Sequence, residues 1–326
     1  MKPSTVLFIL LPLSFLGAPL AAEAPPAEHV PRIGLLSSAP GPARMREVFG
    51  QSLRELGYIE GQNLTVENRY TSGQPELLAQ AAAELVQLPV DVIVAVGSAA
   101  IRAAQQATRT IPIVMLVGGD PIGSGLITSL ARPGGNVTGI TTLSPRLSVQ
   151  RLALLKDVVP RVAQVAILFN PDDETKVVEW QQTQVAARQF GVRLQPLEVR
   201  GPDDLAPAFA AMRQAEIGGL IVLSDALTLR YRSQLVNLAA EHRLPAIYEY
   251  REFVDAGGLL AYGPSLRTLF QRAAAYVDRL LNGARPADLP VEQPMSFELI
   301  INLKTAQALG FTLPPSLLAR ADEVLP

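Results

Sequence analysis

Small polar residues, carboxylates and tyrosines recur directly after short apolar runs of this chain. They are Ser37, Ser38, Gly97, Ser98, Ala99, Asp120, Asn170, Ser224, Asp225 and Tyr248. Backbone N–H groups at a helix start bind anions, so the turn at residues 98–100 suits a ligand carboxylate. Asp225 or Asp120 could meet an ammonium group, and an apolar or aromatic group could lie on Tyr248. This pattern predicts a binding site for a small, amino-acid-like solute.

The serines and Asp120 also have an ordinary structural interpretation. A serine at a helix start commonly caps that helix, and an aspartate before proline, such as Asp120, is a typical turn residue. Arg230 and Arg232 could dock a membrane permease or form solvated surface. The sequence leaves these alternatives open.

The chain is poor in catalytic groups. It has no cysteine, and its two histidines are His29, near the N-terminus, and His242, at the end of a predicted helix. It also lacks a Gly-x-Ser-x-Gly elbow, a Walker loop and a cluster with metal-ligand spacing. We therefore expect no enzyme activity, no metal and no cofactor. An exported α/β enzyme that uses Asp120 and Asp225 is the alternative.

The elements that position these residues alternate between strand and helix. Residues 92–96 and 219–223 are apolar runs of the kind found in parallel strands covered by helices on both faces. In each half, such a run, a helix and a strand entered through Pro112 or Pro245 follow in the same order. The sequence thus predicts an α/β fold with two similar doubly wound parallel-sheet lobes, whose ligand binds at the C-terminal strand ends.

The N-terminus has the order of residues that is typical of a secretory signal peptide. Lys2 precedes an apolar core at residues 6–16, and small residues follow up to Ala22 and Ala24. The core is shorter than the ~20 residues of a membrane span. We expect a signal peptide over residues 1–22, cut after Ala22 or Ala24. No cysteine follows to carry a lipid, so we expect a freely diffusing periplasmic protein without stable membrane insertion.

The composition argues against a small disulfide-dependent domain and against a nucleic-acid-binding protein. A chain of 326 residues can bury ordinary cores in two units without disulfides, and 48% of its residues are hydrophobic. Its net charge of −2 gives no basic face for nucleic acid. Residues 23–31, rich in alanine and proline, are typical of a flexible leader.

Two segments resemble the signature of a bacterial family. One runs from Val117-Gly118-Gly119-Asp120-Pro121 to Asn136-Val137-Thr138-Gly139, and the other from Pro245-Ala246-Ile247-Tyr248 to Tyr262-Gly263-Pro264. They are similar to substrate-binding proteins of ABC transporters related to the tryptophan/tyrosine-binding type. The resemblance covers nearly all of residues 31–325, although the turn at residues 98–100 lacks the Thr-Pro of many relatives. It implies a type I periplasmic-binding fold.

The resemblance also implies a route for the chain through a three-strand hinge. The lobes would be joined at residues 138–143, 261–265 and 290–294. The N-terminal lobe then comprises residues 32–140 and 265–290, and the C-terminal lobe residues 141–264 and 291–326. Gly139 and Gly263 suit such hinges, and Tyr262, at the second crossing, joins the candidate ligand-binding residues.

We therefore expect the extracytoplasmic solute-binding component of an ABC importer. It would act as a monomer, close its lobes on a small polar ligand and deliver that ligand to an inner-membrane permease and its ATPase. The same module could instead signal to a membrane receptor, and the sequence does not separate the two functions.

Overall fold

The computed structural model describes residues 29–38, 43–71, 74–142 and 145–326. The predicted signal peptide and both candidate cleavage sites lie outside the described residues, as do residues 143–144 of the first predicted crossing. Pro31–Pro326 form one compact unit that contains two sheets. In the described part of the chain, no helix combines the length and the apolarity needed to cross a membrane.

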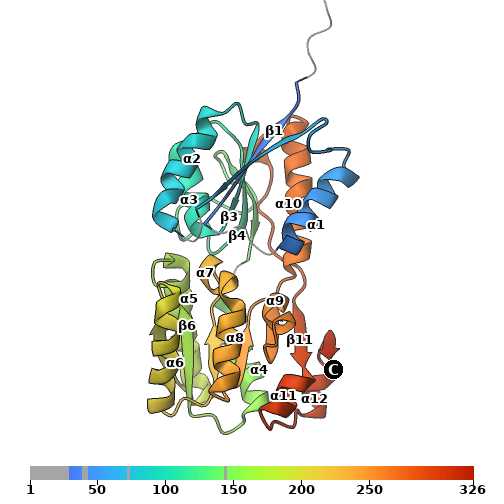
Figure 1. Ribbon diagram of the computed structural model, residues 1–326. Coiled ribbons are helices and arrows are strands. Elements are labelled where there is room, and N and C mark those ends of the chain that lie inside the picture. Colours follow the sequence, from blue (N-terminus) through green and yellow to red (C-terminus); the bar gives the residue numbers. More distant parts are fainter. Residues whose placement is uncertain (1–28, 39–42, 72–73, 143–144) are drawn as a thin grey trace, which may run out of the picture. The chain divides into compact units, whose positions relative to one another are not determined.

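The first sheet has five strands in the order β2-β1-β3-β4-β5, and all neighbours are parallel. Its strands are β1 (Arg32–Ser37), β2 (Thr65–Tyr70), β3 (Val92–Val96), β4 (Ile113–Gly118) and β5 (Val137–Thr141). Val92 and Val94 pack with α1 (Ala43–Glu55) and α10 (Leu266–Leu281). Ile93 and Ala95 pack with α2 (Leu78–Gln87) and α3 (Ser98–Ala107) on the opposite face (Figure 1). Helices thus cover both faces of this sheet, as its apolar strands require.

The second sheet has seven strands in the order β12-β11-β10-β9-β8-β6-β7. They are β6 (Gln164–Phe169), β7 (Arg193–Glu198), β8 (Leu220–Val222), β9 (Ala246–Tyr248), β10 (Leu260–Gly263), β11 (Glu298–Asn302) and β12 (Glu323–Leu325). Neighbours are parallel except β10 and β11. Between these two strands the chain forms α10 on the first sheet, and Glu292 pairs with Ile140 beside β5. Strand β11 therefore returns to the second sheet in the reverse direction.

Helices also cover both faces of the second sheet. They are α4 (Pro145–Val158), α5 (Glu174–Ala187), α6 (Leu205–Gln214), α7 (Ala226–Arg230), α8 (Arg232–Glu241), α9 (Arg251–Asp255), α11 (Leu303–Ala308) and α12 (Pro315–Leu318). Leu220 and Val222 share a core with residues of α6 and α8, whereas Ile221 shares one with residues of α4 and α5. Short 3-10 turns occur at Pro75–Leu77, Arg188–Phe190, Pro202–Asp204 and Pro286–Asp288.

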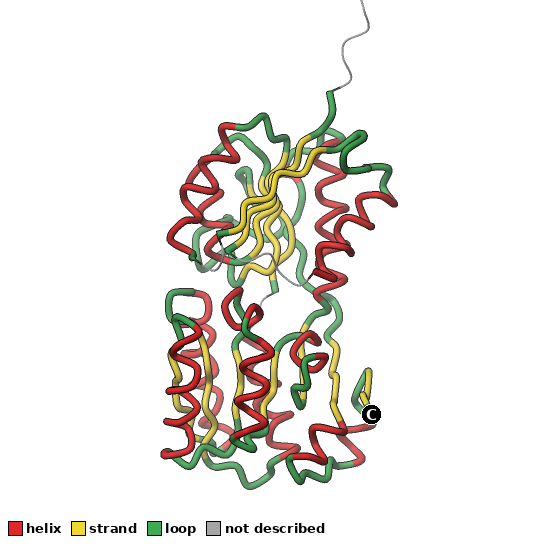
Figure 2. Tube along the Cα trace, viewed as in Figure 1, coloured by secondary structure: helices red, strands yellow, loops and turns green. Residues whose placement is uncertain are grey.

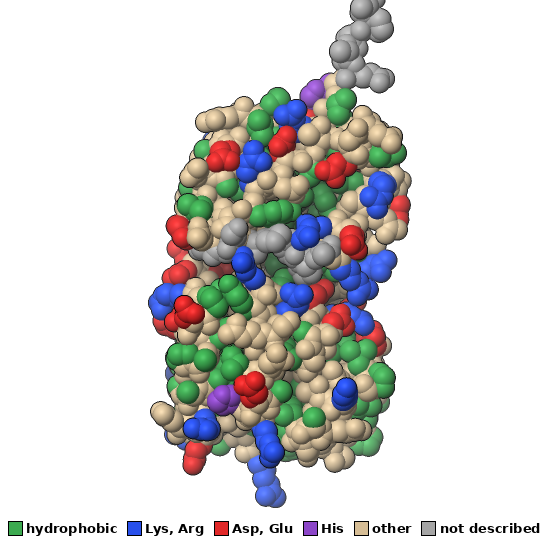
Figure 3. All heavy atoms as spheres, viewed as in Figure 1, with side chains coloured by type: hydrophobic (Ala, Val, Ile, Leu, Met, Phe, Trp, Pro, Cys, Tyr) green, Lys and Arg blue, Asp and Glu red, His purple; other side chains and the backbone are tan. Residues whose placement is uncertain are grey.

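The strands of the first sheet cross one another with a pronounced twist (Figure 2). Acidic and basic side chains are interspersed over the face drawn in Figure 3, in keeping with a net charge of −2.

Candidate functional site

A cavity of about 550 Å³ lies where strand ends of the two sheets meet within the unit of residues 31–326. The predicted residues that line it are Ser37, Ser38, Gly97, Ser98, Ala99, Asn170, Ser224 and Asp225. They follow β1, β3, β6 and β8, because the carboxyl ends of parallel strands share one edge of a sheet. The fold therefore brings most of the candidate residues together at one cavity.

The turn at Gly97 and Ser98 belongs to the first lobe and contacts the second. Helix α3 begins at Ser98, with Gly97 in the left-handed region at φ 89° and with no side-chain cap. The Ser98 hydroxyl lies instead 3.3 Å from the Thr175 hydroxyl of the second lobe and 3.5 Å from the backbone nitrogen of Gly119. The N-terminal turn of α3, with Ala99 and Ala100, thus remains at the cavity wall, where it can bind an anion.

Ser224 offers an unused hydrogen-bonding group. Its side chain is only 1% exposed, and its hydroxyl has no hydrogen-bond partner in the described part of the chain. Leaving a buried hydroxyl unpaired costs ~1–3 kcal/mol. Because Ser224 lines the cavity, a polar ligand group could satisfy this hydroxyl and recover that cost.

Asp225 both caps a helix and faces the cavity. One carboxylate oxygen accepts from the backbone nitrogen of Thr228 at 2.8 Å, and the other accepts from the Asn170 amide at 3.0 Å. Burial raises the pKa of the Asp225 carboxyl above its ordinary value, while the hydrogen bonds from Thr228 and Asn170 oppose this shift. The geometry of Asp225 is therefore compatible with the predicted contact to a ligand, and it also shows a helix cap that the sequence analysis did not predict.

Lys176 lines the cavity and belongs to a buried group of charges, which we call the buried charge network. Its members are Arg151, Lys176, Glu179 and Glu249. The Lys176 ammonium lies 3.1 Å from Glu179 and 3.7 Å from Glu249. Burial alone would lower the pKa of Lys176, but these two carboxylates outweigh it and hold the pKa above its ordinary value. The ammonium therefore stays charged at the cavity wall.

Aromatic and cationic residues that were not among the predicted site residues also line the cavity. They are Tyr70, Tyr250, Phe270, Arg200, Arg230 and Arg232. Arg230 and Arg232 lie on either side of Tyr231, where α7 ends and α8 begins. The cavity thus combines apolar rings with groups of both charges, which suits a ligand with a charged head and an apolar body.

Tyr248 does not line the cavity, although the sequence predicts that a ligand group could lie on it. Its side chain is fully buried and stacks on Phe253, with ring centroids 4.7 Å apart and an interplanar angle of 9°. Because β9 is covered by helices on both faces, Tyr248 at its end belongs to the core. Tyr250, two residues further on, lines the cavity instead.

Asp120 and Tyr262 also lie away from the cavity lining. An Asp120 carboxylate oxygen accepts from the backbone nitrogens of Ile122 at 3.1 Å and Gly123 at 3.0 Å, which is the turn role considered above. The Tyr262 carbonyl accepts from Arg151 Nε at 2.8 Å, and its ring lies 6.2 Å from that of Phe297. Asp120 thus stabilises a turn, and Tyr262 anchors Arg151 through its backbone carbonyl.

Comparisons with known proteins agree with this architecture. The sequence model of one family, described as ABC transporter substrate binding protein, matches residues 33–325. The tyrosine-binding protein of Clostridioides difficile strain R20291 is 26% identical over 278 residues, which are 85% of this chain and 79% of that protein.

Two solved structures are similar over 91% of this chain and 100% of their own. A conserved domain protein from Vibrio cholerae has a TM-score of 0.85 and 27% identity. The ABC domain from Streptococcus pneumonia in complex with L-Trp has a TM-score of 0.84 and 25% identity. The predicted fold of two doubly wound lobes, of the type I periplasmic-binding class, is confirmed.

Proposed function

Because the chain belongs to the family of ABC transporter substrate-binding proteins, we propose that it captures an amino acid with an apolar or aromatic side chain and delivers it to an inner-membrane importer. Proteins of this family bind small solutes and are not enzymes. The alternative of an exported enzyme that uses Asp120 and Asp225 is therefore wrong.

The observation that carries the proposed ligand class is the unpaired hydroxyl of Ser224 beside the Asp225 carboxylate at the cavity wall. Together they suit a ligand ammonium group, with the carboxylate supplying charge and the hydroxyl a further acceptor. The start of α3 at Ser98 suits the ligand carboxylate. The rings of Tyr70 and Phe270 supply apolar surface for the ligand side chain.

The relatives support the same class of ligand. One is a tyrosine-binding protein, and the other was solved with L-Trp. Tyrosine and tryptophan share an ammonium group, a carboxylate and a flat aromatic side chain, which are the three features that the cavity lining suits.

A thermal-shift screen tests the proposed ligand class. The protein without residues 1–22 is refolded to remove any carried-over ligand and is heated with each of the standard amino acids and with small organic acids. A true ligand at 100 times its dissociation constant stabilises the fold by ~2.7 kcal/mol. We expect L-tyrosine or L-tryptophan to give the largest shift. No shift with any aromatic amino acid would contradict the proposed ligand.

Export is a separate part of the proposal. We infer that residues 1–22 are removed and that the chain works in the periplasm as a monomer, beside a permease and its ATPase. Cell fractionation followed by mass spectrometry tests this directly. The mature protein is expected in the periplasmic fraction with Glu23 or Pro25 as its first residue, whereas a cytoplasmic protein that retains residues 1–22 would contradict it.

Uptake distinguishes import from sensing. Cells that lack this chain should take up the radiolabelled amino acid found in the screen more slowly than wild-type cells, and plasmid-borne protein should restore the rate. Uptake that does not depend on the chain would instead favour the signalling alternative.

A further inference from the structure

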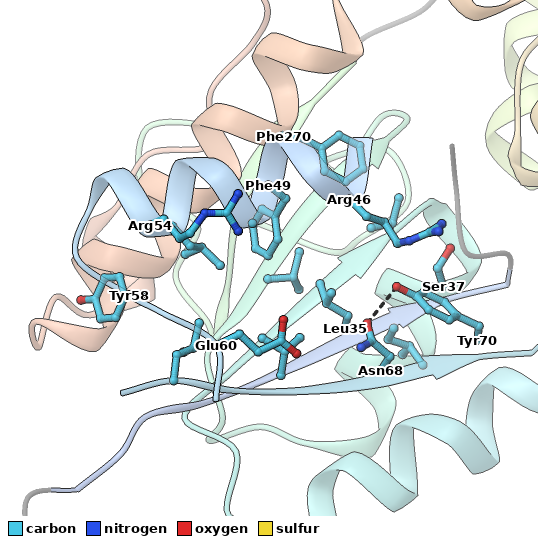
Figure 4. A pocket seen from close by; sticks show the side chains of 17 residues that line it. Leu35, Ser37, Arg46, Phe49, Arg54, Tyr58, Glu60, Asn68, Tyr70 and Phe270 are labelled. Carbon is cyan, nitrogen blue, oxygen red and sulfur yellow. Dashed lines mark hydrogen bonds between the residues drawn. The ribbon is translucent and has the colours of Figure 1, made fainter. Parts of the chain in front are cut away.

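A second cavity of about 260 Å³ lies inside the first lobe, between α1 and the β1–β2 edge of its sheet. We call it the side cavity. Its interior is apolar, with Leu35, Phe49, Leu53, Leu64 and Val94 among the lining residues (Figure 4). Phe49, Leu53, Leu64 and Val94 are each at most 4% exposed. The exposed residues Arg46, Arg54, Glu60 and Asn68 also line it, so the side cavity combines buried apolar walls with a polar part that faces solvent.

The side cavity adjoins the cavity at the strand ends. Four residues line both of them, namely Ser37, Tyr70, Val96 and Phe270. In Figure 4, Ser37 and Tyr70 lie together at one end of the side cavity, and the Phe270 ring lies apart from them, near that of Phe49. The two spaces therefore share a boundary that is formed largely by two aromatic rings.

Tyr70 is held in place at this boundary. Its hydroxyl donates to the Asn68 side-chain oxygen at 2.8 Å, a bond drawn in Figure 4. Burial raises the pKa of the Tyr70 hydroxyl and the nearby Arg46 guanidinium opposes that shift, so Arg46 also lies near this end. The Tyr70 ring thus has a fixed position, at which a flat group that passes between the cavities would contact it.

We propose that the side cavity receives the aromatic side chain of the bound amino acid, while the ammonium and carboxylate groups stay at Ser224, Asp225 and the start of α3. This inference rests on the proposed function and adds the place where ligand size is selected. Each additional ring atom that is buried against apolar residues makes the binding free energy more favourable. A cavity of limited size therefore discriminates between ligands by their size. The residues that line the side cavity would therefore determine which aromatic amino acid binds best.

Gly50 of α1 allows the side cavity to be filled without disturbing the fold. It lines this cavity, and an added Cβ atom would meet only the Arg54 guanidinium, at 3.7 Å. Glycine inside a helix is also unfavourable relative to residues that carry a side chain. Gly50→Leu should therefore occupy the side cavity while the unliganded protein remains as stable as the wild type.

Calorimetric titration of refolded wild type, Gly50→Ala and Gly50→Leu with L-tryptophan and L-phenylalanine tests the inference. Gly50→Leu is expected to weaken L-tryptophan binding by ~10-fold or more. L-Phenylalanine should lose less, because its smaller ring needs less of the side cavity. Gly50→Ala adds only one methyl group to the same position and should weaken L-tryptophan binding less than Gly50→Leu does. Melting temperatures without ligand verify that all three proteins are folded.

The possible results separate the inference from the proposed function. Wild type that binds an aromatic amino acid, with Gly50→Leu unchanged or with equal losses for both probes, would overturn the side-cavity inference alone. Wild type that binds neither of these probes nor L-tyrosine in the same titration would overturn the proposed ligand class and, with it, the inference.

Discussion

The proposed ligand contact depends most on one buried group, the hydroxyl of Ser224. It is buried at the cavity wall, and the described residues supply no hydrogen-bond partner for it. A buried hydroxyl of this kind lowers the stability of the unliganded protein, and this cost is recovered when a ligand pairs with it. Ser224 is thus an example of local cost that binding can offset.

Ser224→Ala is therefore expected to stabilise the unliganded protein. Removing the unpaired hydroxyl should raise the free energy of unfolding by ~1 kcal/mol, as measured by urea denaturation. The matched control is Ser52→Ala, because the Ser52 hydroxyl is also buried but donates to the Val48 carbonyl at 2.9 Å. That control should not stabilise the protein. Equal effects of the two substitutions would contradict the role assigned to Ser224.

The effect of Asp225 on the free energy of unfolding should depend on pH. Its raised pKa means that the folded protein binds this proton more tightly than the unfolded chain does. The ionised carboxylate therefore costs stability above the ordinary aspartate range, near pH 4, and this cost disappears below it. Asp225→Asn keeps an acceptor for the Thr228 nitrogen but carries no charge. It should stabilise the unliganded protein at pH 7 and lose this advantage toward pH 3.

Urea denaturation of wild type and Asp225→Asn at a series of pH values measures this difference. Asp120→Asn, at a carboxylate that caps an ordinary turn, is the control. An advantage of Asp225→Asn that is the same at pH 3 and pH 7 would show that the charge of Asp225 is not what destabilises the fold.

At the scale of elements, the buried charge network ties together α4, α5 and the ends of β9 and β10. Arg151 on α4 lies 3.3 Å from Glu179 on α5 and 3.5 Å from Glu249, which follows β9. Arg151 Nε also donates to the carbonyl of Tyr262 on β10. Since β10 leads out of the second sheet toward α10 on the first, the network fixes the strand at one of the predicted crossings.

Arg151→Met should be strongly destabilising. Removing one member of a buried ionic group leaves its partners' charges uncompensated, at a cost of ~3–5 kcal/mol. The matched control is Arg320→Met, since Arg320 pairs with Asp157 at 2.9 Å while both side chains are about half exposed. Exposed pairs contribute ~0–1 kcal/mol. Chemical denaturation measures both variants, and a loss in Arg151→Met as small as in Arg320→Met would contradict this account of the network.

Gly139 in β5 lies close to the backbone of Met115 in the neighbouring strand β4. Its φ of 123° is unfavourable for other residues, and an added Cβ would lie 2.3 Å from the Met115 carbonyl oxygen of the neighbouring strand β4. Gly139→Ala should therefore cost more than the ~1–2 kcal/mol of a left-handed backbone alone. Gly61→Ala isolates that backbone cost, because Gly61 has a φ of 80° and open space around it. Equal losses in the two variants would show that the contact with β4 is relaxed.

The strand-end rule explains which of the predicted site residues line the cavity and which do not. Ser98, Ser224 and Asp225 directly follow buried strands, and periodicity alone locates them. Phe270 comes from α10, whose covering of the first sheet depends on a crossing that hydrophobic pattern does not reveal. The exchange of Tyr248 for Tyr250 depends on where β9 ends and which side chain remains in the core. Such details follow from tertiary packing.

At the scale of the whole molecule, two sheets contribute opposite walls to one binding cavity within the unit of residues 31–326. Arg102 of α3 and Glu174 of α5 are 2.7 Å apart, and Ser98 contacts Thr175 nearby. These contacts join the first lobe to the second beside the cavity. A ligand that touches both walls would stabilise this arrangement, as closure on a solute requires.

We propose that an aromatic amino acid binds in this cavity through Ser224 and Asp225. Isothermal titration calorimetry of refolded wild type and of the Ser224→Ala/Asp225→Asn double variant, with L-tyrosine and L-tryptophan, tests this proposal. We predict one site per chain in the wild type and an affinity ~10-fold or more lower in the double variant. Absence of binding in the wild type, or equal affinity in a folded double variant, would contradict the account.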